Sequence, residues 1–193
     1  DGTLVLPIGS LGTDYMLTSY EGLSGWALYS NAVIVATENG TQVEIIPSVN
    51  TLGGKTAGTS YIINLNEGQS YQLKAATTST DLTGTIIRGT INNGMCRPFA
   101  VFSGSMCTNI PVGCTACDHL YEQEYPTNIW GKNYLIAPFS FATSYTYKVL
   151  ANSNGTTFTI NGGGTQNLNA GQVYEANYVT GPVYIAANKK ISV

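Results

Sequence analysis

The chain has 193 residues, of which 43% are hydrophobic and only 10% are charged, and its formal net charge is −3. This length suits one large all-β domain or two closely packed halves, and the hydrophobic share is enough to form a buried core. The Lys and Arg residues form no run, which argues against a nucleic-acid partner, and no segment approaches the roughly 18 apolar residues that membrane insertion of a helix needs.

Short segments rich in Val, Ile, Thr and Tyr are separated by glycine-containing turns along the whole chain, which predicts strands rather than helices. Asn39-Gly40 is the favoured pair for a two-residue type I′ hairpin, because both central residues of that turn need a positive φ. In the strand that follows, residues 42–45 alternate, so that Val43 and Ile45 would face the core.

The same succession of turns and strands recurs later in the chain. After a second tight turn with Gly68 in the strained position, similar segments follow in the same order, and Asn154-Gly155 would form the second hairpin. The repeat matches three pairs of segments: 12–15 with 131–134, 36–45 with 151–160, and 65–71 with 168–174. We therefore expect an all-β fold of two similar antiparallel β-sandwich-like lobes that arose by internal duplication.

Between the two repeats lies a segment without a counterpart. We expect a first β repeat at 1–104, a cysteine-rich, disulfide-bearing insert at 105–130, and a second β repeat at 131–193, the three together forming one structural unit. Residues 98–102 are continuously apolar and predict a strand buried on both faces. Residues 118–124 are the one candidate for a helical turn, which Pro126 would end. The last repeat segment stops inside a strand, so the chain is expected to be a piece of a longer protein.

The four cysteines, Cys96, Cys107, Cys114 and Cys117, favour disulfides and therefore an oxidising compartment. Of the three possible pairings we prefer Cys107 with Cys117, around Pro111 and Gly113, and Cys96 with Cys114, although spacing alone does not decide. A zinc site that includes His119 and a redox pair at Cys114 and Cys117 are the weaker alternatives, since neither has the usual spacing or context.

Several polar groups gather around the histidine in sequence. Asp118 and His119, with Glu122 and Glu124 nearby, could form a catalytic pair or a cation site, but no nucleophile motif accompanies them. The preferred interpretation is a buried polar cluster in which Asp118 caps the short turn. We therefore expect no enzyme activity, no metal and no cofactor.

Aromatic and asparagine residues leave two further options open. Most of the 13 tyrosines are expected in cross-strand pairs, whereas Trp26 and Trp130 could each be an exposed anchor or a cover for the core. Asn39 and Asn154 also begin Asn-Gly-Thr glycosylation sequences, but we interpret them first as turn residues.

Residues 116–123 read ACDHLYEQ, and this block with the later Trp-Gly-Lys resembles the IgGFc-binding protein N-terminal domain family. Segments 81–85, 97–104 and 168–172 resemble other recurring blocks of that family. The resemblance implies a non-catalytic extracellular module, of a kind found in an animal mucus protein and in large bacterial surface proteins. It also implies structural roles for the motif residues, which are Asp118, His119, Glu122, Gln123, Trp130, Gly131 and Lys132.

Together these features predict an extracellular or cell-surface binding or adhesion module of a larger protein. Its partner would be an extracellular protein or a glycan, with self-association as a further option. The alternative function is that of a structural spacer or a subunit of an extracellular filament assembled by β-strand pairing. No residues of a ligand-binding site can be named from the sequence.

Overall fold

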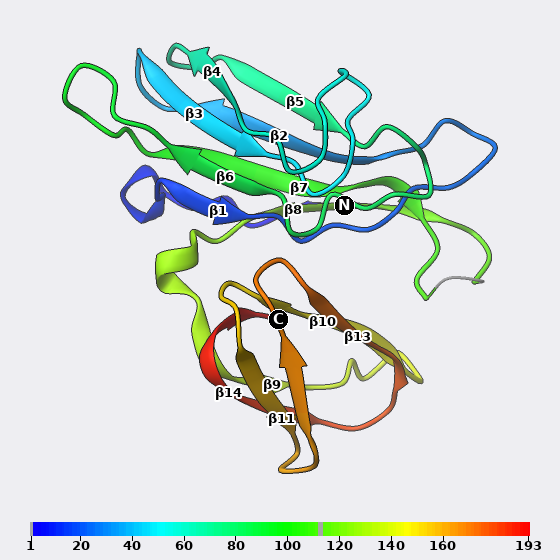
Figure 1. Ribbon diagram of the computed structural model, residues 1–193. Coiled ribbons are helices and arrows are strands. Elements are labelled where there is room, and N and C mark those ends of the chain that lie inside the picture. Colours follow the sequence, from blue (N-terminus) through cyan, green and yellow to red (C-terminus); the bar gives the residue numbers. More distant parts are fainter. Residues whose placement is uncertain (1, 112–113) are drawn as a thin grey trace. The chain divides into compact units, whose positions relative to one another are not determined.

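The computed structural model describes residues 2–111 and 114–193, and Figure 1 shows that these residues form almost nothing but strands and connecting loops. Two short 3-10 helices, Ile8–Ser10 and Thr127–Ile129, are the helical elements of this described part, so the all-β prediction is confirmed. The chain divides into two compact units, Asp1–Asn109 with Thr115–Asn128, and Ile110–Cys114 with Ile129–Val193. Within the described ranges no helix has the length and apolar character needed to cross a bilayer.

The first unit consists of two antiparallel four-stranded sheets. One has the order β1 (Asp14–Met16), β6 (Ile86–Gly89), β3 (Thr41–Ile46) and β4 (Tyr61–Leu65). The other has the order β5 (Ser70–Lys74), β2 (Ser30–Ala36), β7 (Phe99–Thr108) and β8 (Asp118–Gln123).

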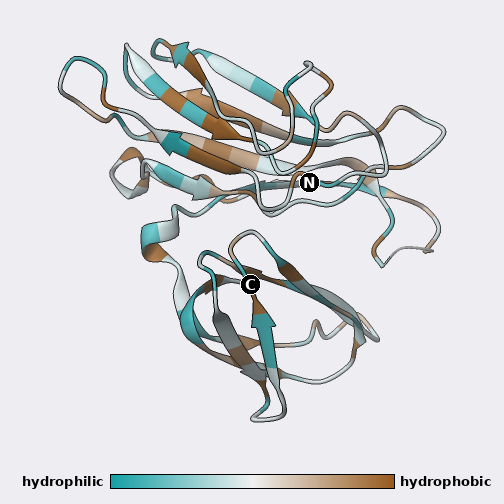
Figure 2. Cartoon of the chain, in the orientation of Figure 1, coloured by the Kyte–Doolittle hydropathy of each residue, from teal (hydrophilic) through white to brown (hydrophobic). Residues whose placement is uncertain are grey.

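The core of this unit follows from residue alternation along its strands. In β2 and β3 every second residue is buried, and Val43 and Ile45 face inward as predicted. Figure 2 shows the resulting change between hydrophobic and hydrophilic residues along β3. In β7 the residues Phe99, Ala100 and Val101 are buried in succession, so burial on both faces is confirmed for these three residues of the segment expected at 98–102, whereas Pro98 lies outside the strand and Phe102 is only half-buried. Each large apolar side chain that is fully buried contributes roughly 1.5–3 kcal/mol.

The predicted hairpin at Asn39-Gly40 is wrong. β2 pairs with β5 and β7, whereas β3 pairs with β4 and β6, so the turn carries the chain from one sheet to the other. Gly40 has a φ of 72°, but Asn39 is not among the residues with positive φ, and a type I′ turn requires both. The predicted strained glycine of the second turn is confirmed, because Gly68 has a φ of 74°.

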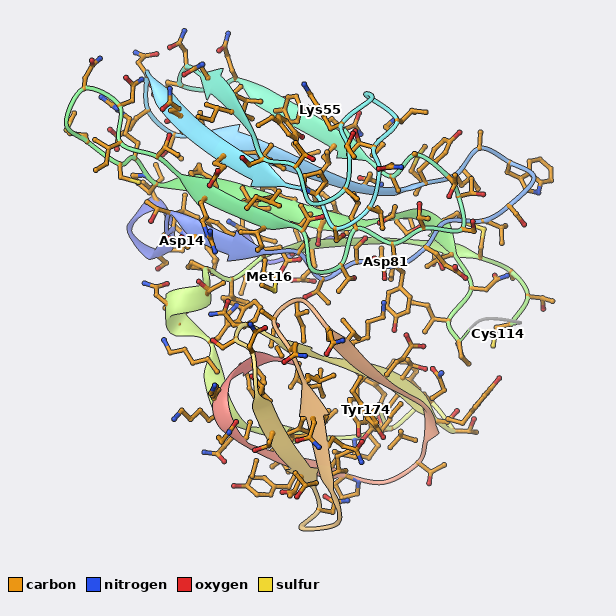
Figure 3. All side chains as sticks on the ribbon, viewed as in Figure 1. Asp14, Met16, Lys55, Asp81, Cys114 and Tyr174 are labelled. Atoms are coloured by element: carbon orange, nitrogen blue, oxygen red, sulfur yellow. A yellow bond between two sulfur atoms is a disulfide. The ribbon has the colours of Figure 1, made fainter. Side chains whose placement is uncertain are left out.

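The second unit contains six antiparallel strands. These are β9 (Gly131–Ile136), β10 (Tyr145–Ala151), β11 (Thr156–Ile160), β12 (Thr165–Leu168), β13 (Val173–Val179) and β14 (Val183–Ser192). The long strand β14 pairs with β9 and β11 through its first half and reaches β10 at its end, where Ile191 pairs with Ala151. Figure 3 labels Tyr174 in this unit, where its ring packs against Phe158 and Tyr147 in the core. The Asn154-Gly155 turn joins β10 to β11, which do not pair with each other, so this second predicted hairpin is also wrong.

The two units share their strand plan. β9 takes the place of β1, β10 to β13 those of β2 to β5, and β14 those of β6 and β7 together. In each unit the hydroxyl group of a tyrosine in the first strand accepts a glycine N–H and donates to a backbone carbonyl. In the first unit Tyr15 accepts from Gly12 N at 2.8 Å and donates to Phe99 O of β7 at 2.7 Å. In the second unit Tyr134 accepts from Gly131 N at 2.9 Å and donates to Ile191 O of β14 at 2.7 Å.

The segment between the repeats does not contain the predicted helical turn. Its first residues continue β7 to Thr108, and Asp118–Gln123 form strand β8, which pairs with β7. The helical interpretation of 118–124 is therefore wrong, because pairing with the preceding strand β7 decides the conformation of this segment.

Candidate functional site

The most distinctive sequence block of the chain forms an edge strand of the first unit. Strand β8 is paired on one side with β7, where Tyr121 lies opposite Gly104 and Gln123 opposite Phe102. Along the strand the side chains separate into an exposed set, which includes His119 and Tyr121, and a buried end at Gln123. The strand thus both anchors itself and displays side chains to solvent.

Glu124, directly after β8, is buried within the first unit. Its Oε1 atom accepts hydrogen bonds from the Thr18 backbone N–H and from the Ser103 hydroxyl, both at 2.6 Å. The pKa of this carboxyl group is raised to about 7; burial is the largest cause, the two hydrogen bonds oppose it, and the negative charge of nearby Glu122 adds to it. Sequence reasoning placed Glu124 in a polar cluster but missed its two partners, which are distant along the chain.

The end of β8 also fastens the N-terminal segment. Gln123 Oε1 accepts the Leu6 backbone N–H at 2.6 Å, and the Gln123 backbone N–H donates to the Thr3 hydroxyl at 3.1 Å. The Thr3 hydroxyl in turn donates to Glu122 Oε1 at 2.8 Å. Glu122 and Gln123 therefore hold an otherwise irregular segment against the edge strand, which gives a physical reason for a Glu-Gln pair in this block.

The solvent side of β7 and β8 carries an aromatic pair. The rings of Phe102 and Tyr121 are stacked, with 5.3 Å between centroids and 3° between planes. Phe102 lies opposite Val33 of β2, and all three side chains point away from the core to which Val101 and Ile34 belong. Tyr121 is 49% exposed. We call Val33, Phe102 and Tyr121 the aromatic face. Apart from the general abundance of tyrosine, no feature of the sequence indicates it.

The expected buried cluster of Asp118 and His119 is not formed. The two side chains are 80% and 48% exposed, and the Asp118 carboxylate accepts the His119 backbone N–H at 2.8 Å instead of capping a helical turn. Glu122 lies in β8 and is exposed, whereas Glu124 follows the strand and is buried. In the described part of the chain no group of three or more His, Cys, Asp or Glu side chains is placed to hold a metal ion.

The cysteines form one of the two preferred disulfides. Cys107 of β7 is bonded to Cys117, directly before β8, with 5.5 Å between their Cα atoms, and closes the loop at the end of this strand pair. Cys96 and Cys114, the latter labelled in Figure 3, are free thiols, so the second predicted disulfide is wrong. Gly113, which was expected in the closed loop, lies outside the described residues.

The two tryptophans have different environments. Trp130 is 6% exposed, whereas Trp26 is 76% exposed in a turn whose neighbours Gly25 and Ala27 both have positive φ. Gly131 starts β9 and donates its N–H to Tyr134, and Lys132 follows it in the same strand. The Trp-Gly-Lys block therefore forms the beginning of the second unit.

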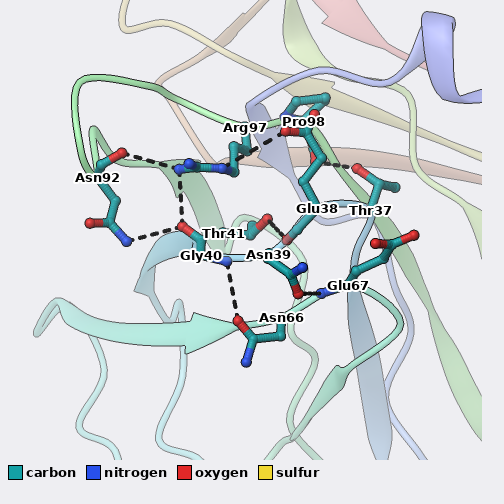
Figure 4. Close-up of polar contacts among 10 residues, drawn as sticks. All are labelled: Thr37, Glu38, Asn39, Gly40, Thr41, Asn66, Glu67, Asn92, Arg97 and Pro98. Carbon is teal, nitrogen blue, oxygen red and sulfur yellow. Dashed lines mark hydrogen bonds and ion pairs between the residues drawn. The ribbon is translucent and has the colours of Figure 1, made fainter.

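The turns at Asn39-Gly40 and Asn154-Gly155, each of which joins strands that do not pair with each other, are held by matching hydrogen bonds. Figure 4 shows the first: Asn39 Oδ1 accepts the Glu67 N–H, and Asn66 Oδ1 accepts the Gly40 N–H, both at 3.2 Å. In the second unit Asn154 Oδ1 accepts the Ala170 N–H at 3.0 Å, and Asn169 Oδ1 accepts the Gly155 N–H at 3.2 Å.

A cation then closes each of these turns. Arg97 donates to Gly40 O at 3.2 Å and lies 3.8 Å from Glu38, while Lys189 donates to Asn154 O at 2.6 Å. The repeat in the sequence could have identified Asn66 and Asn169 as partners of these turns, because both occupy the same repeat position.

Comparison with known proteins agrees with this description. The profile of the family described as IgGFc binding protein matches residues 1–193. The human protein named IgGFc-binding protein is 28% identical over 195 residues, which cover 99% of this chain and 3% of that protein. The chain therefore spans a small fraction of this relative's length. No solved structure matches. Because the family profile covers the chain from end to end, the chain belongs to the IgGFc-binding protein family.

Proposed function

We propose that this chain is a non-catalytic, extracellular binding module of a larger protein and that it recognises another protein. Membership of a family named for binding a protein supports the activity, and the small share of the human relative that the chain covers supports the role of a module. The Cys107–Cys117 disulfide supports an oxidising, extracellular setting.

The observation that carries the proposed location of binding is the aromatic face. Protein interfaces are enriched in aromatic side chains, and a Tyr held against a second ring loses little conformational entropy when it is covered. The stacking of Tyr121 on Phe102 provides such a pre-ordered contact, and β8 holds it between a disulfide and a buried anchor. His119, two residues before Tyr121 on the same face of β8, offers a polar group for the rim of an interface.

A binding assay with a matched control tests this proposal. The chain is immobilised and exposed to human IgG Fc, suggested by the name of the relative, and to arrays of extracellular proteins and of glycans. We expect a protein partner whose binding is reduced at least tenfold by Tyr121→Ala and little by Tyr184→Ala, since Tyr184 is similarly exposed in the second unit. Binding to glycans alone would contradict a protein partner, and loss of binding only in Tyr184→Ala would contradict the aromatic face.

Assembly by strand pairing is the second candidate function, and the edge strand β13 supports it. β13 pairs with β10 on one side, and none of the described strands pairs with its other side. A strand edge of this kind can accept a further strand. Polymers whose length grows with concentration would support assembly, whereas a protein that stays monomeric at high concentration would contradict it.

A further inference from the structure

The chain contains four Asn-Gly pairs, at 39–40, 93–94, 154–155 and 161–162, and their surroundings differ sharply. Asparagine before glycine can lose its side-chain amide, because the glycine backbone nitrogen can attack the side-chain carbonyl carbon and no Cβ on the glycine hinders the approach. The reaction needs a free glycine N–H and an asparagine side chain that can turn toward it. Hydrogen bonds to either group should slow it.

Three of the four pairs have their reacting groups engaged. At Asn39-Gly40 and Asn154-Gly155, the glycine N–H donates to the side chain of Asn66 or Asn169. The Oδ1 atom of Asn39 or Asn154 accepts a backbone N–H from the same later loop. Asn161 Oδ1 accepts the Tyr184 N–H at 2.7 Å, and its Nδ2 lies 3.5 Å from Pro182 O. In these pairs the side chain must first break bonds to the surrounding structure.

Asn93-Gly94 forms the tip of a hairpin in the first unit. Asn92 and Met95 exchange two backbone hydrogen bonds of 2.9 and 3.2 Å, and the central residues have φ values of 52° and 77°, as a type I′ turn requires. Both central residues are exposed. Among the residues that the structure describes, neither the Asn93 side chain nor the Gly94 N–H has a hydrogen-bond partner.

We propose that Asn93-Gly94 is a site of spontaneous modification, at which Asn93 is converted to aspartate and isoaspartate faster than the other three asparagines. The Gly94 nitrogen forms a bond to Asn93 Cγ while the bond from Cγ to the side-chain nitrogen breaks. The Gly94 proton leaves with that nitrogen as ammonia, and a five-membered succinimide remains. Water then opens the ring at either carbonyl, which gives a carboxylate on the side chain or, in isoaspartate, on the main chain.

The position of the turn gives this change a structural consequence. Isoaspartate lengthens the backbone by one carbon, which disrupts the two bonds between Asn92 and Met95. Asn92 also binds Gly40 O through its side chain and Arg97 through its carbonyl, so the modification reaches the first inter-sheet turn (Figure 4). The hairpin carries the exposed apolar side chains of Ile91 and Met95, whose presentation would change as the protein ages.

Incubation of the folded chain at mildly alkaline pH, followed by peptide mapping and enzymatic labelling of isoaspartate, tests the proposal. We expect conversion at Asn93 to be several-fold faster than at Asn39, Asn154 and Asn161. Asn93→Gly should abolish it while keeping the turn, because Gly-Gly also suits type I′ geometry.

The denatured chain is the control for the structural cause. In urea all four asparagines precede glycine without fixed partners, so their rates should become similar. Fastest conversion at Asn39 or Asn154 in the folded chain would overturn the proposal. The same preference for Asn93 in urea would overturn it too, because local sequence would then be the cause.

Discussion

In both units an Asn-Gly turn joins two strands that do not pair with each other, and an asparagine of a later loop holds this turn in place. The bonds from Asn66 to Gly40 and from Asn169 to Gly155 have the same atoms and the same 3.2 Å length. The closing cation differs: the guanidinium of Arg97 also lies near Glu38, whereas the Lys189 ammonium donates to Asn154 O. The two turns therefore share the same hydrogen bonds to asparagine side chains and differ in the charged residue that binds a turn carbonyl.

The last sheet strand is where the two units differ most. In the first unit β7 runs to Thr108 and is joined by β8, with the disulfide at one end and buried Glu124 at the other. In the second unit β14 ends its pairing with β10 at Ser192. Most of the ACDHLYEQ block therefore lies in the strand that joins β7 in the first unit, and β8 displays side chains of this block at the edge of a sheet.

The largest predicted effect concerns Glu124, which has no counterpart in the second unit. Its pKa is about 7 in the folded protein and near 4.5 in the unfolded chain, so folding takes up a proton between these values. Its stabilising contribution is full below pH 4.5 and lost as the pH rises through 7, a change of about 3 kcal/mol. Urea unfolding should show this fall in the unmodified chain but not in Glu124→Gln. Equal pH dependence in both would contradict the buried carboxyl.

Removal of the disulfide should also affect the first unit alone. Cys117→Ser opens a loop with a sequence separation of 10 residues and should lower the free energy of unfolding by about 2–3 kcal/mol. Cys96→Ser, at a free thiol, is the matched control and should change it little. Hydrogen exchange resolved by segment measures both, and faster exchange in β10 and β11 of Cys117→Ser would contradict independent stabilisation of the two units.

The tyrosines at equivalent positions provide a sharper comparison. Tyr15→Phe leaves the half-buried Gly12 N–H and the fully buried Phe99 carbonyl without their partner and should cost about 1–3 kcal/mol. Tyr134→Phe removes the same two bonds where they are only partly buried and should cost less. Unfolding of each variant in urea tests the order, and a larger loss for Tyr134→Phe would reverse our ranking of the two sites.

The smallest effect is expected at Asn66 and Asn169, which accept the glycine N–H of the turns at Asn39-Gly40 and Asn154-Gly155. Asn66→Ala and Asn169→Ala each remove the acceptor of one glycine N–H at an exposed site, and each should cost about 1 kcal/mol. Similar shifts in thermal unfolding would support equivalent turns. If one variant lost stability and the other did not, the two hydrogen bonds would not contribute equally to stability, although their geometry matches.

Much of the fold could be predicted from local sequence. The alternation of apolar and polar residues around Val43 predicted which face of β3 is buried, and Gly68 predicted a turn. Both predictions succeed because both features depend on residues that are close in sequence. The pair Asn39-Gly40 wrongly indicated a hairpin, because an Asn-Gly turn can join paired strands or strands that do not pair. The hydrogen bond that holds this turn, from Gly40 N to Asn66, comes from a loop that is distant along the chain. Both residues have positive φ instead at Asn93-Gly94 and at Asn161-Gly162, the latter between the paired strands β11 and β12, and the repeat marked neither pair.

The candidate site was less predictable for the same reason. The block around His119 was correctly identified as distinctive, but its burial and conformation depend on pairing with β7, and the partners of Glu124 are Thr18 and Ser103. Spacing could indicate that Cys107 and Cys117 close a loop. It could not show that Tyr121 stacks on Phe102, because that contact needs the register between two strands.

The most direct test of the proposed binding face is a hydrogen-exchange footprint of the chain in complex with the protein partner found by the binding assay. We predict slower exchange in β7 and β8, from Phe99 to Thr108 and from Asp118 to Gln123, with strands β9 to β14 unchanged. Protection confined to residues 131–193 would contradict the account, since the distinctive strand of the family would then lie outside the interface.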